Sequence, residues 1–161
     1  MKTLDLTSAS SEQTMHIAKT LAKYLSNGDT VVLTGELGSG KTKFTEGFLG
    51  YFGLENEISS PTFNIVNEYQ SGFTNIYHFD VYRLSDTEEF YAIGGEEYFD
   101  KGICLIEWGE LIDDALPFQY IHISFEKSNS EPEIRILHIN TLGEKYDEII
   151  NNLKEELAWK Y

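Results

Sequence analysis

An α/β fold with a mixed, partly antiparallel sheet is predicted by three features of the sequence. A short β-branched apolar run, residues 30–34, leads into a glycine-rich loop, and a helical spacing of apolar residues follows that loop. A second apolar run, residues 103–106, has the length and composition of a buried strand. Strand patterns at 63–69 and 76–80 are joined by a turn at 70–72, and strands joined so tightly must pair antiparallel.

Composition sets the size of the unit and limits its partners. With 161 residues, 41% of them hydrophobic and 14% aromatic, residues 1–161 are expected to form a single domain with a packed core. The 12 Lys and Arg residues against 27 Asp and Glu residues give a formal net charge of −15. Such a charge repels a nucleic-acid backbone, so strong direct binding of nucleic acid by this chain alone is not expected. The acidic surface suits either solubility or docking to a basic protein.

The segment before the glycine-rich loop predicts an edge strand and a helix. Leu4 and Leu6 alternate with polar neighbours, as in a half-buried strand. Ser10 and Gln13 then form a capping box, and the helical pattern that follows is expected to end at 27–28. The polar turn before this helix can flank an adenine pocket, or it is an ordinary helix cap.

Residues 35–42 fit the spacing of a glycine, four residues and Gly-Lys-Thr, which binds nucleotide phosphates. They are Gly35, Glu36, Leu37, Gly38, Ser39, Gly40, Lys41 and Thr42. The glycines permit backbone angles that turn N–H groups toward a phosphate, and the next helix adds the positive end of its dipole. Lys41 would reach the β- and γ-phosphates, and the Thr42 hydroxyl would be a Mg²⁺ ligand. The alternative, a chance match in a glycine turn, arises on the order of one time in a hundred or less.

Three positions downstream are candidates for acting on the phosphates. Thr62 precedes a predicted strand, where it is either a switch threonine that senses Mg²⁺ and the γ-phosphate or part of an ordinary turn. Asp80 ends a strand, where α/β sheets place ligand-facing residues; a solvated strand end or a pair with Arg83 is the alternative. Glu107 ends the apolar run 103–106, the pattern of a buried strand that delivers an acid to Mg²⁺ or to the attacking water, although a plain strand end has the same pattern.

The remaining elements are expected to complete the fold. Residues 85–100 are acidic with a helical pattern, and five core contacts are expected there: Phe90, Tyr91, Ile93, Tyr98 and Phe99. Residues 121–125 and 134–139 look like a further pair of strands, Thr141 and Glu144 form a second capping box, and a terminal helix follows.

Features linked to compartment point to the cytoplasm. Cys104 is the single cysteine and lies in an apolar run, so a buried core residue in a reducing compartment is expected rather than a nucleophile. The first residues carry no apolar signal region, and no stretch of 18 apolar residues occurs. We therefore expect a cytoplasmic protein without a membrane partner.

Missing motifs narrow the class of nucleotide-binding protein. No Asn-Lys-X-Asp sequence for guanine is present, which disfavours a GTPase. Arginine occurs only at positions 83 and 135, whereas small-molecule kinases of this type usually need several arginines to clamp two phosphate-bearing substrates. The chain is also too short for a helicase or a transporter motor. With these classes disfavoured, the remaining interpretation is a compact ATPase whose hydrolysis acts on another molecule.

Four motifs in fixed order then carry a resemblance to a known family: residues 35–42, 60–63, 78–84 and 106–108. With them the chain resembles the TsaE family, also called YjeE, the bacterial ATPases of tRNA threonylcarbamoyladenosine (t6A) synthesis. The resemblance implies a P-loop NTPase-like three-layer sandwich with a mixed sheet, ATP and Mg²⁺ as cofactors, and a complex with the TsaB and TsaD proteins. Those partners place a threonylcarbamoyl group on a tRNA adenosine, so tRNA would be met only through the complex.

The resemblance also implies roles for individual residues. Residues 35–42 would hold the phosphates, Thr62 would act as a switch-like sensor, and Asp80 and Glu107 would be the two carboxylates around Mg²⁺ and the attacking water. Which of the two ligates the metal and which positions the water is left open. The expectation is a weak ATPase that a protein complex stimulates. A nucleotide-dependent protein-binding switch with incidental hydrolysis is the second interpretation, and a small-molecule kinase is the third.

Overall fold

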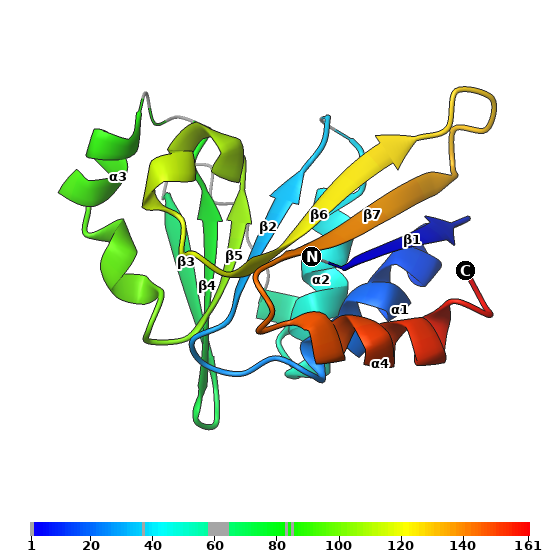
Figure 1. The fold of residues 1–161 in the computed structure, drawn as a ribbon, viewed down its shortest axis with the longest axis horizontal. Helices are drawn as coiled ribbons and strands as arrows, with labels where there is room; N and C mark the ends of the chain where they lie inside the picture. Colours follow the sequence, from blue (N-terminus) through cyan, green and yellow to red (C-terminus); the bar gives the residue numbers. More distant parts are fainter. Residues whose placement is uncertain (1, 37, 58–64, 83, 85) are drawn as a thin grey trace.

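A mixed β-sheet with helices on both faces forms the framework of the protein (Figure 1). The computed structural model describes residues 2–36, 38–57, 65–82, 84 and 86–161. The strands within these ranges are β1 (Thr3–Ser8), β2 (Thr30–Thr34), β3 (Val66–Ser71), β4 (Thr74–Asp80), β5 (Ile103–Glu107), β6 (Tyr120–Lys127) and β7 (Arg135–Leu142). The α-helices are α1 (Ser11–Ala22), α2 (Lys41–Tyr51), α3 (Thr87–Ala92) and α4 (Asp147–Leu157), and the 3-10 helices are η1 (Glu55–Glu57), η2 (Gly95–Tyr98) and η3 (Gly109–Ala115).

The strand order explains how the sheet brings distant segments together. It runs β1-β7-β6-β2-β5-β4-β3. The central strands β6, β2, β5 and β4 are parallel, whereas β1 pairs antiparallel with β7, β7 with β6, and β3 with β4. The prediction of a mixed sheet, with a hairpin between β3 and β4, is therefore confirmed. Because β2, β5 and β4 are parallel neighbours, their carboxyl ends meet at one edge of the sheet, where α/β proteins bind ligands.

One face of the sheet is covered by α1, α2 and α4. Side chains of these helices and of the strands form a large buried cluster that includes Ile17, Phe44, Phe48, Leu105 and Leu153. Helices α1 and α2 approach closely at Gly47, where an added Cβ would lie 2.4 Å from the backbone oxygen of Met15. The position of α2, and of the loop that precedes it, therefore depends on a residue without a side chain.

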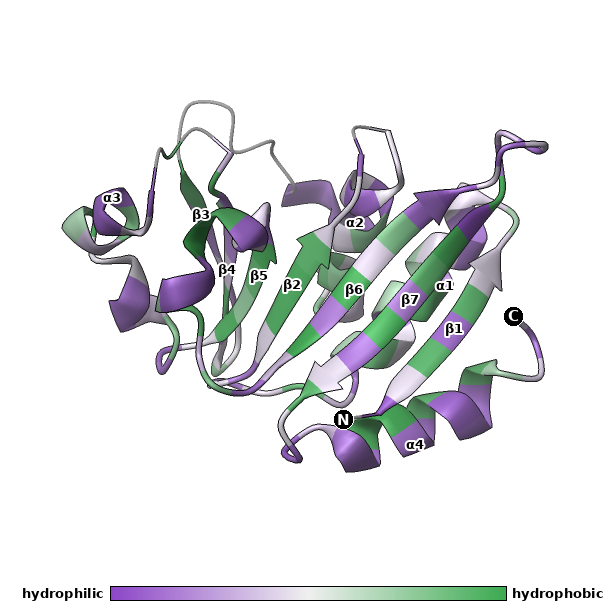
Figure 2. Ribbon diagram, turned by 45° about the horizontal axis from the view of Figure 1, so that its top comes forward, coloured by the Kyte–Doolittle hydropathy of each residue, from purple (hydrophilic) through white to green (hydrophobic). Residues whose placement is uncertain are grey.

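The opposite face is covered over β2, β5 and β4. A second cluster there joins Val32, Phe79 and Ile106 to Phe90 of α3 and Ile112 of η3. Burial follows this arrangement, since β5 is buried at every residue whereas β6 and β7 alternate. Figure 2 shows the same contrast as largely continuous hydrophobic colour on β2 and β5 and as bands on β6, β7 and β1.

Several local predictions hold and others are wrong. Ser10 caps α1 by accepting from the Gln13 amide, but the helix ends at Ala22 rather than at 27–28. The second capping box is wrong because Thr141 lies inside β7, and its hydroxyl donates to Asp147 at the start of α4. Tyr91 and Ile93 are exposed, whereas Phe90 is buried and Tyr98 and Phe99 pack half-buried against the second cluster. In the six-residue helix α3, Phe90 is the one buried residue, and the chain leaves the helix at Ile93.

Cys104 is buried in β5, as expected for a core residue. Burial raises the pKa of its thiol to about 12. The thiol is therefore protonated at neutral pH and is not a nucleophile. Within the described ranges, no helix is both long enough and apolar enough to cross a membrane.

Candidate nucleotide-binding site

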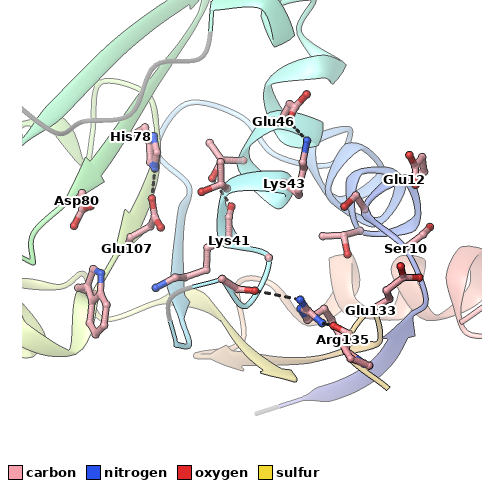
Figure 3. Close-up of a pocket in the computed structure, with 18 residues that line it drawn as sticks. Ser10, Glu12, Lys41, Lys43, Glu46, His78, Asp80, Glu107, Glu133 and Arg135 are labelled. Carbon is pink, nitrogen blue, oxygen red and sulfur yellow. Dashed lines mark hydrogen bonds and ion pairs between the residues drawn. The ribbon is translucent and has the colours of Figure 1, made fainter. Parts of the chain in front are cut away.

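A cavity of about 730 Å³ lies at the edge of the sheet where the parallel strands end. It is lined by the loop before α2, by the first residues of α1 and α2, by the ends of β4 and β5, and by the segment that leads into β7. Figure 3 shows Lys41 between two groups of side chains: His78, Asp80 and Glu107 lie on one side, and Ser10, Glu12, Glu133 and Arg135 lie on the other. Residues predicted from distant parts of the sequence are thus brought to one place.

The first wall of the cavity, here called the P-loop wall, consists of Gly38, Gly40, Lys41 and Thr42. Gly38 and Gly40 have φ angles of 77° and 111°, which residues with a side chain rarely adopt. Gly40 is the N-cap of α2 and supplies no side-chain cap, and no acidic residue lies in the first turn. The first N–H groups of α2 and the positive end of its dipole are therefore left for an anion in the cavity.

Lys41 is buried without a carboxylate partner among the described residues. Its Nζ donates to the Gly35 carbonyl oxygen at 2.8 Å and lies 4.3 Å from the centre of the Trp108 ring. A carbonyl and a ring face hold the ammonium group without neutralising it. The positive charge of Lys41 is therefore available to a phosphate that enters the cavity.

The opposite wall, here called the carboxylate wall, consists of His78, Asp80 and Glu107. Asp80 ends β4 and Glu107 ends β5, and the two residues are paired in the register of these parallel strands. Asp80 is half-buried, and its Oδ1 accepts from the Tyr82 amide at 3.1 Å. Glu107 is buried, with 9% of its surface exposed. Two carboxylates from sequence positions far apart thus stand side by side.

His78 contributes a contact that the sequence interpretation missed. Its Nε2 lies 2.7 Å from Oε2 of Glu107, and both side chains are buried. The other ring nitrogen, Nδ1, is buried and has no hydrogen-bond partner in the described part of the chain. Such an unpaired group costs about 1–3 kcal/mol. The sequence signal was the position of His78 two residues before Asp80, which places both on the same face of β4.

Trp108 reaches Lys41 through an unusual backbone conformation. It has a φ angle of 65° and is the one non-glycine residue among those described with a positive φ. The next residue, Gly109, packs so closely on β2 that a Cβ would lie 2.5 Å from a methyl group of Val32. The chain therefore turns sharply after Glu107, and the indole ring contacts both Lys41 and the ring of Tyr82, whose centre is 5.0 Å from the indole centre.

The other end of the cavity is formed by residues that were not predicted as ligands. Arg135, at the start of β7, donates from Nη2 to the Gly38 carbonyl oxygen at 3.2 Å. Glu133 precedes it, and Ser10 and Glu12 face it from the start of α1. Ser10 is both the helix cap and a lining residue, so the two interpretations of this polar turn are compatible. The scarcity of arginine in the chain was the signal that could have pointed to Arg135.

The remaining predicted site residues are placed as follows. Gly35, Glu36 and Ser39 belong to the loop itself, where the Ser39 amide donates to the Glu36 carbonyl oxygen at 3.1 Å. The buried Ser39 hydroxyl has no partner among the described residues. Leu37 and Thr62 lie outside the described residues, as does Arg83, the alternative partner of Asp80.

The donor set near the P-loop fits a magnesium ion. Mg²⁺ prefers oxygen ligands and is usually bound by one or two carboxylates together with phosphates and water. Thr42, Asp80 and Glu107 offer a hydroxyl and two carboxylates at the same cavity. In the described ranges, no cluster of three or more His, Cys, Asp or Glu side chains could hold a metal by itself.

Comparisons with known proteins agree on one family. Residues 8–136 match the family model "Threonylcarbamoyl adenosine biosynthesis protein TsaE". The chain is 37% identical over 154 residues, 95% of each chain, to the tRNA threonylcarbamoyladenosine biosynthesis protein TsaE of Bacillus subtilis (strain 168). It is 43% identical over 118 residues, 73% of this chain, to the TsaE protein of Rickettsia conorii, of which 67% is covered. The crystal structure of Bacillus subtilis YdiB is similar with a TM-score of 0.81 and 33% identity over 96% of each chain.

Proposed function

The chain belongs to the TsaE family of threonylcarbamoyl adenosine biosynthesis, and from this premise we propose that it is the component that binds and hydrolyses ATP. A role in t6A biosynthesis follows from the family. The observation that carries the proposal of hydrolysis is that one cavity holds both Lys41, which has no carboxylate partner among the described residues, and the carboxylates of Asp80 and Glu107. Residues 1–161 would act as a single nucleotide-binding domain.

The P-loop wall would bind the phosphates. Backbone N–H groups of residues 35–42, the start of α2 and the Lys41 ammonium group together offer donors and positive charge where the rest of the chain is acidic. On binding, Lys41 would exchange the Gly35 carbonyl oxygen for phosphate oxygens. Thr62, the proposed sensor of the γ-phosphate, completes this assignment.

The carboxylate wall would act on the terminal phosphate. Thr42, Asp80 and Glu107 would hold Mg²⁺ and orient the attacking water. When bound, the metal would neutralise developing charge on the phosphate oxygens. Trp108 lines the same cavity and contacts the Lys41 ammonium group.

The end of the cavity lined by Ser10, Glu12, Glu133 and Arg135 would accommodate the nucleoside. It lies across the cavity from the carboxylates, with the P-loop wall between them. A nucleotide whose phosphates lie on the P-loop would therefore extend its sugar and base toward this side. The proposal assigns ATP as the nucleotide on the basis of the family.

The partners would be TsaB and TsaD, with tRNA contacted through them. A net charge of −15 opposes direct binding of tRNA by this chain, so a complex is the physical route to a tRNA substrate. Turnover by the chain alone is expected to be weak and to rise in the complex. A role in tRNA modification would place this activity in the cytoplasm.

A nucleotide-dependent binding switch is the second candidate, and one observation favours it. Trp108 contacts both Lys41 and Tyr82, and 63% of the Tyr82 surface is exposed. If Lys41 left Trp108 on phosphate binding, the change would therefore be passed through Trp108 to the exposed side chain of Tyr82. In this case hydrolysis would be incidental to partner binding.

Phosphate release from Mg²⁺-ATP, measured with and without the organism's own TsaB and TsaD, tests the proposal. Slow release that rises with the partners and stops when EDTA removes the metal is expected. Nucleotide binding without stimulated release would support the binding switch instead. A phosphorylated acceptor molecule among the products would favour a kinase and contradict both.

A further inference from the structure

We propose that His78 is a positioning residue for Glu107: its Nε2–H group holds one carboxylate oxygen so that the other is presented to the cavity. The inference deepens the proposed hydrolytic function and rests on it. His78 itself would touch neither nucleotide nor metal. It would act by fixing the direction of a buried carboxylate that can otherwise rotate.

The contact is short and buried, and the strand register sets it. Nε2 of His78 lies 2.7 Å from Oε2 of Glu107, while 3% of the His78 surface is exposed. On β4, His78 stands opposite Leu105, and the next same-face residue, Asp80, stands opposite Glu107. The imidazole therefore reaches diagonally across to the neighbouring strand and approaches Glu107 from the side away from the strand end. Figure 3 shows the resulting contact, with Asp80 apart from it.

The hydrogen bond also fixes the tautomer of the ring. An ionised carboxylate can only accept, so Nε2 must carry the proton, and Nδ1 of a neutral ring is then bare. Nδ1 is buried without a partner among the described residues. If His78 served only to fill space, an apolar side chain would avoid this cost, since its same-face neighbours Ile76 and Leu105 are apolar and buried. The one polar contact that His78 makes in the described structure is the one to Glu107.

The expected function of this contact is to leave Oε1 of Glu107 for chemistry. A glutamate has three side-chain torsions, and burial alone does not select one orientation of its carboxylate. A hydrogen-bond donor on Oε2 selects one orientation in advance. Such preorganisation raises kcat more than it raises the affinity for the nucleotide. Partners that orient a functional carboxylate typically contribute about 10- to 100-fold.

A matched pair of amide substitutions separates this role from packing. In His78→Gln the amide nitrogen falls near the original Nε2 position, whereas in His78→Asn it falls near Nδ1. Both variants replace the ring with one amide group, and urea denaturation of each variant shows whether it is folded under the assay conditions. We expect His78→Asn to lower kcat about 10-fold or more, His78→Gln to stay within about 3-fold of wild type, and both to keep the affinity for metal-free ADP. Equal loss of kcat in both variants would overturn the inference.

The carboxylate itself supplies a second test. In a Glu107→Gln background, His78→Asn should cause no further fall in kcat, because the group that it orients is already altered. A full additional 10-fold loss would show that His78 acts elsewhere.

A third measurement does not depend on turnover. Two-bond ¹H–¹⁵N spectra of the imidazole rings, with His78 assigned by comparison with His78→Gln, should show a ring protonated at Nε2 and bare at Nδ1. A ring that carries its proton on Nδ1 and none on Nε2 would contradict the inference even in an active protein. Conversely, an Nε2-protonated ring in a chain that releases no phosphate, alone or with TsaB and TsaD, would sustain the His78 contact while the proposed hydrolysis failed.

Discussion

The P-loop wall and the carboxylate wall of the cavity differ in how they are built. The P-loop wall comes from one continuous segment, and its groups are backbone amides, a helix terminus and Lys41. The carboxylate wall comes from two strands whose residues are neighbours only through the register of β4 and β5. The first wall offers positive potential and the second offers buried negative charge. The difference suggests that affinity for the nucleotide and action on it can be changed separately.

The largest expected effect is on turnover, in Glu107→Gln. This change keeps the side-chain volume and can still accept the His78 hydrogen bond, but it removes the negative charge. General-base and metal-ligand carboxylates contribute on the order of 100- to 10,000-fold, and kcat should fall within that range. Affinity for metal-free ADP should stay close to wild type by calorimetry. Glu110→Gln, on the exposed start of η3, is the matched control, and an equal loss there would remove the distinction between the walls.

The next effect is on binding, in Lys41→Ala. Two charge-assisted hydrogen bonds of about 1.5–3 kcal/mol each correspond to a loss of roughly 100-fold or more in affinity for ADP and ATP. Lys43→Ala is the control on the same helix, because Lys43 also lines the cavity but its half-exposed side chain pairs with Glu46 at 3.2 Å. That variant should lose less than about 5-fold. Similar losses in both variants would mean that overall positive charge, rather than the position of Lys41, sets affinity.

A smaller effect tests whether the P-loop wall depends on the packing of α2. In Gly47→Ala the new Cβ must push against the backbone of Met15, and overpacking of this kind costs about 1–3 kcal/mol of unfolding free energy. Affinity for ADP should fall as well, while kcat at saturating ATP is less affected. In Gly50→Ala, one turn later, the nearest atom is 3.9 Å away, and a gain of about 0.5–1 kcal/mol is expected. Urea denaturation of both variants decides between these outcomes.

The smallest effect lies far from both walls, at His138 on β7. Its two ring nitrogens bind Glu126 at 2.7 Å and Asp5 at 2.8 Å, and these hydrogen bonds raise its pKa above the ordinary 6.5. The stabilisation is therefore full below about pH 6.5 and is lost as pH rises through the folded-state pKa. Comparing urea midpoints of the wild type and His138→Asn from pH 5.5 to 9 should show a difference that shrinks with rising pH. Nucleotide affinity should not follow this trend.

The two walls also differ in how far sequence reasoning could reach them. The P-loop wall was predictable because its residues are consecutive and each spacing has a local physical meaning. Asp80 and Glu107 were predictable as strand ends, but their juxtaposition depended on β4 and β5 being neighbours, which no local pattern specifies. The contact between His78 and Glu107 joins positions 29 residues apart and depends on the same register.

Other features were out of reach for similar reasons. Arg135 reaches the loop because β7 lies next to β6 and its first residue stands beside Gly38. The left-handed turn at Trp108 is not expected from any preference of tryptophan, and it stands next to Gly109, which packs closely on Val32. The predicted capping box at Thr141 shows the opposite error, because a local motif was overruled by strand pairing.

One measurement tests the division between the walls most directly: bound nucleotide and released phosphate, determined on the same samples of wild type, Lys41→Ala and Glu107→Gln with Mg²⁺-ATP, TsaB and TsaD. We predict that wild type binds nucleotide and releases phosphate, and that Glu107→Gln binds nucleotide without releasing phosphate. At the nucleotide concentration that saturates wild type, Lys41→Ala should neither bind nucleotide nor release phosphate. Normal release by Lys41→Ala, or loss of binding in Glu107→Gln to the same extent as in Lys41→Ala, would contradict the account.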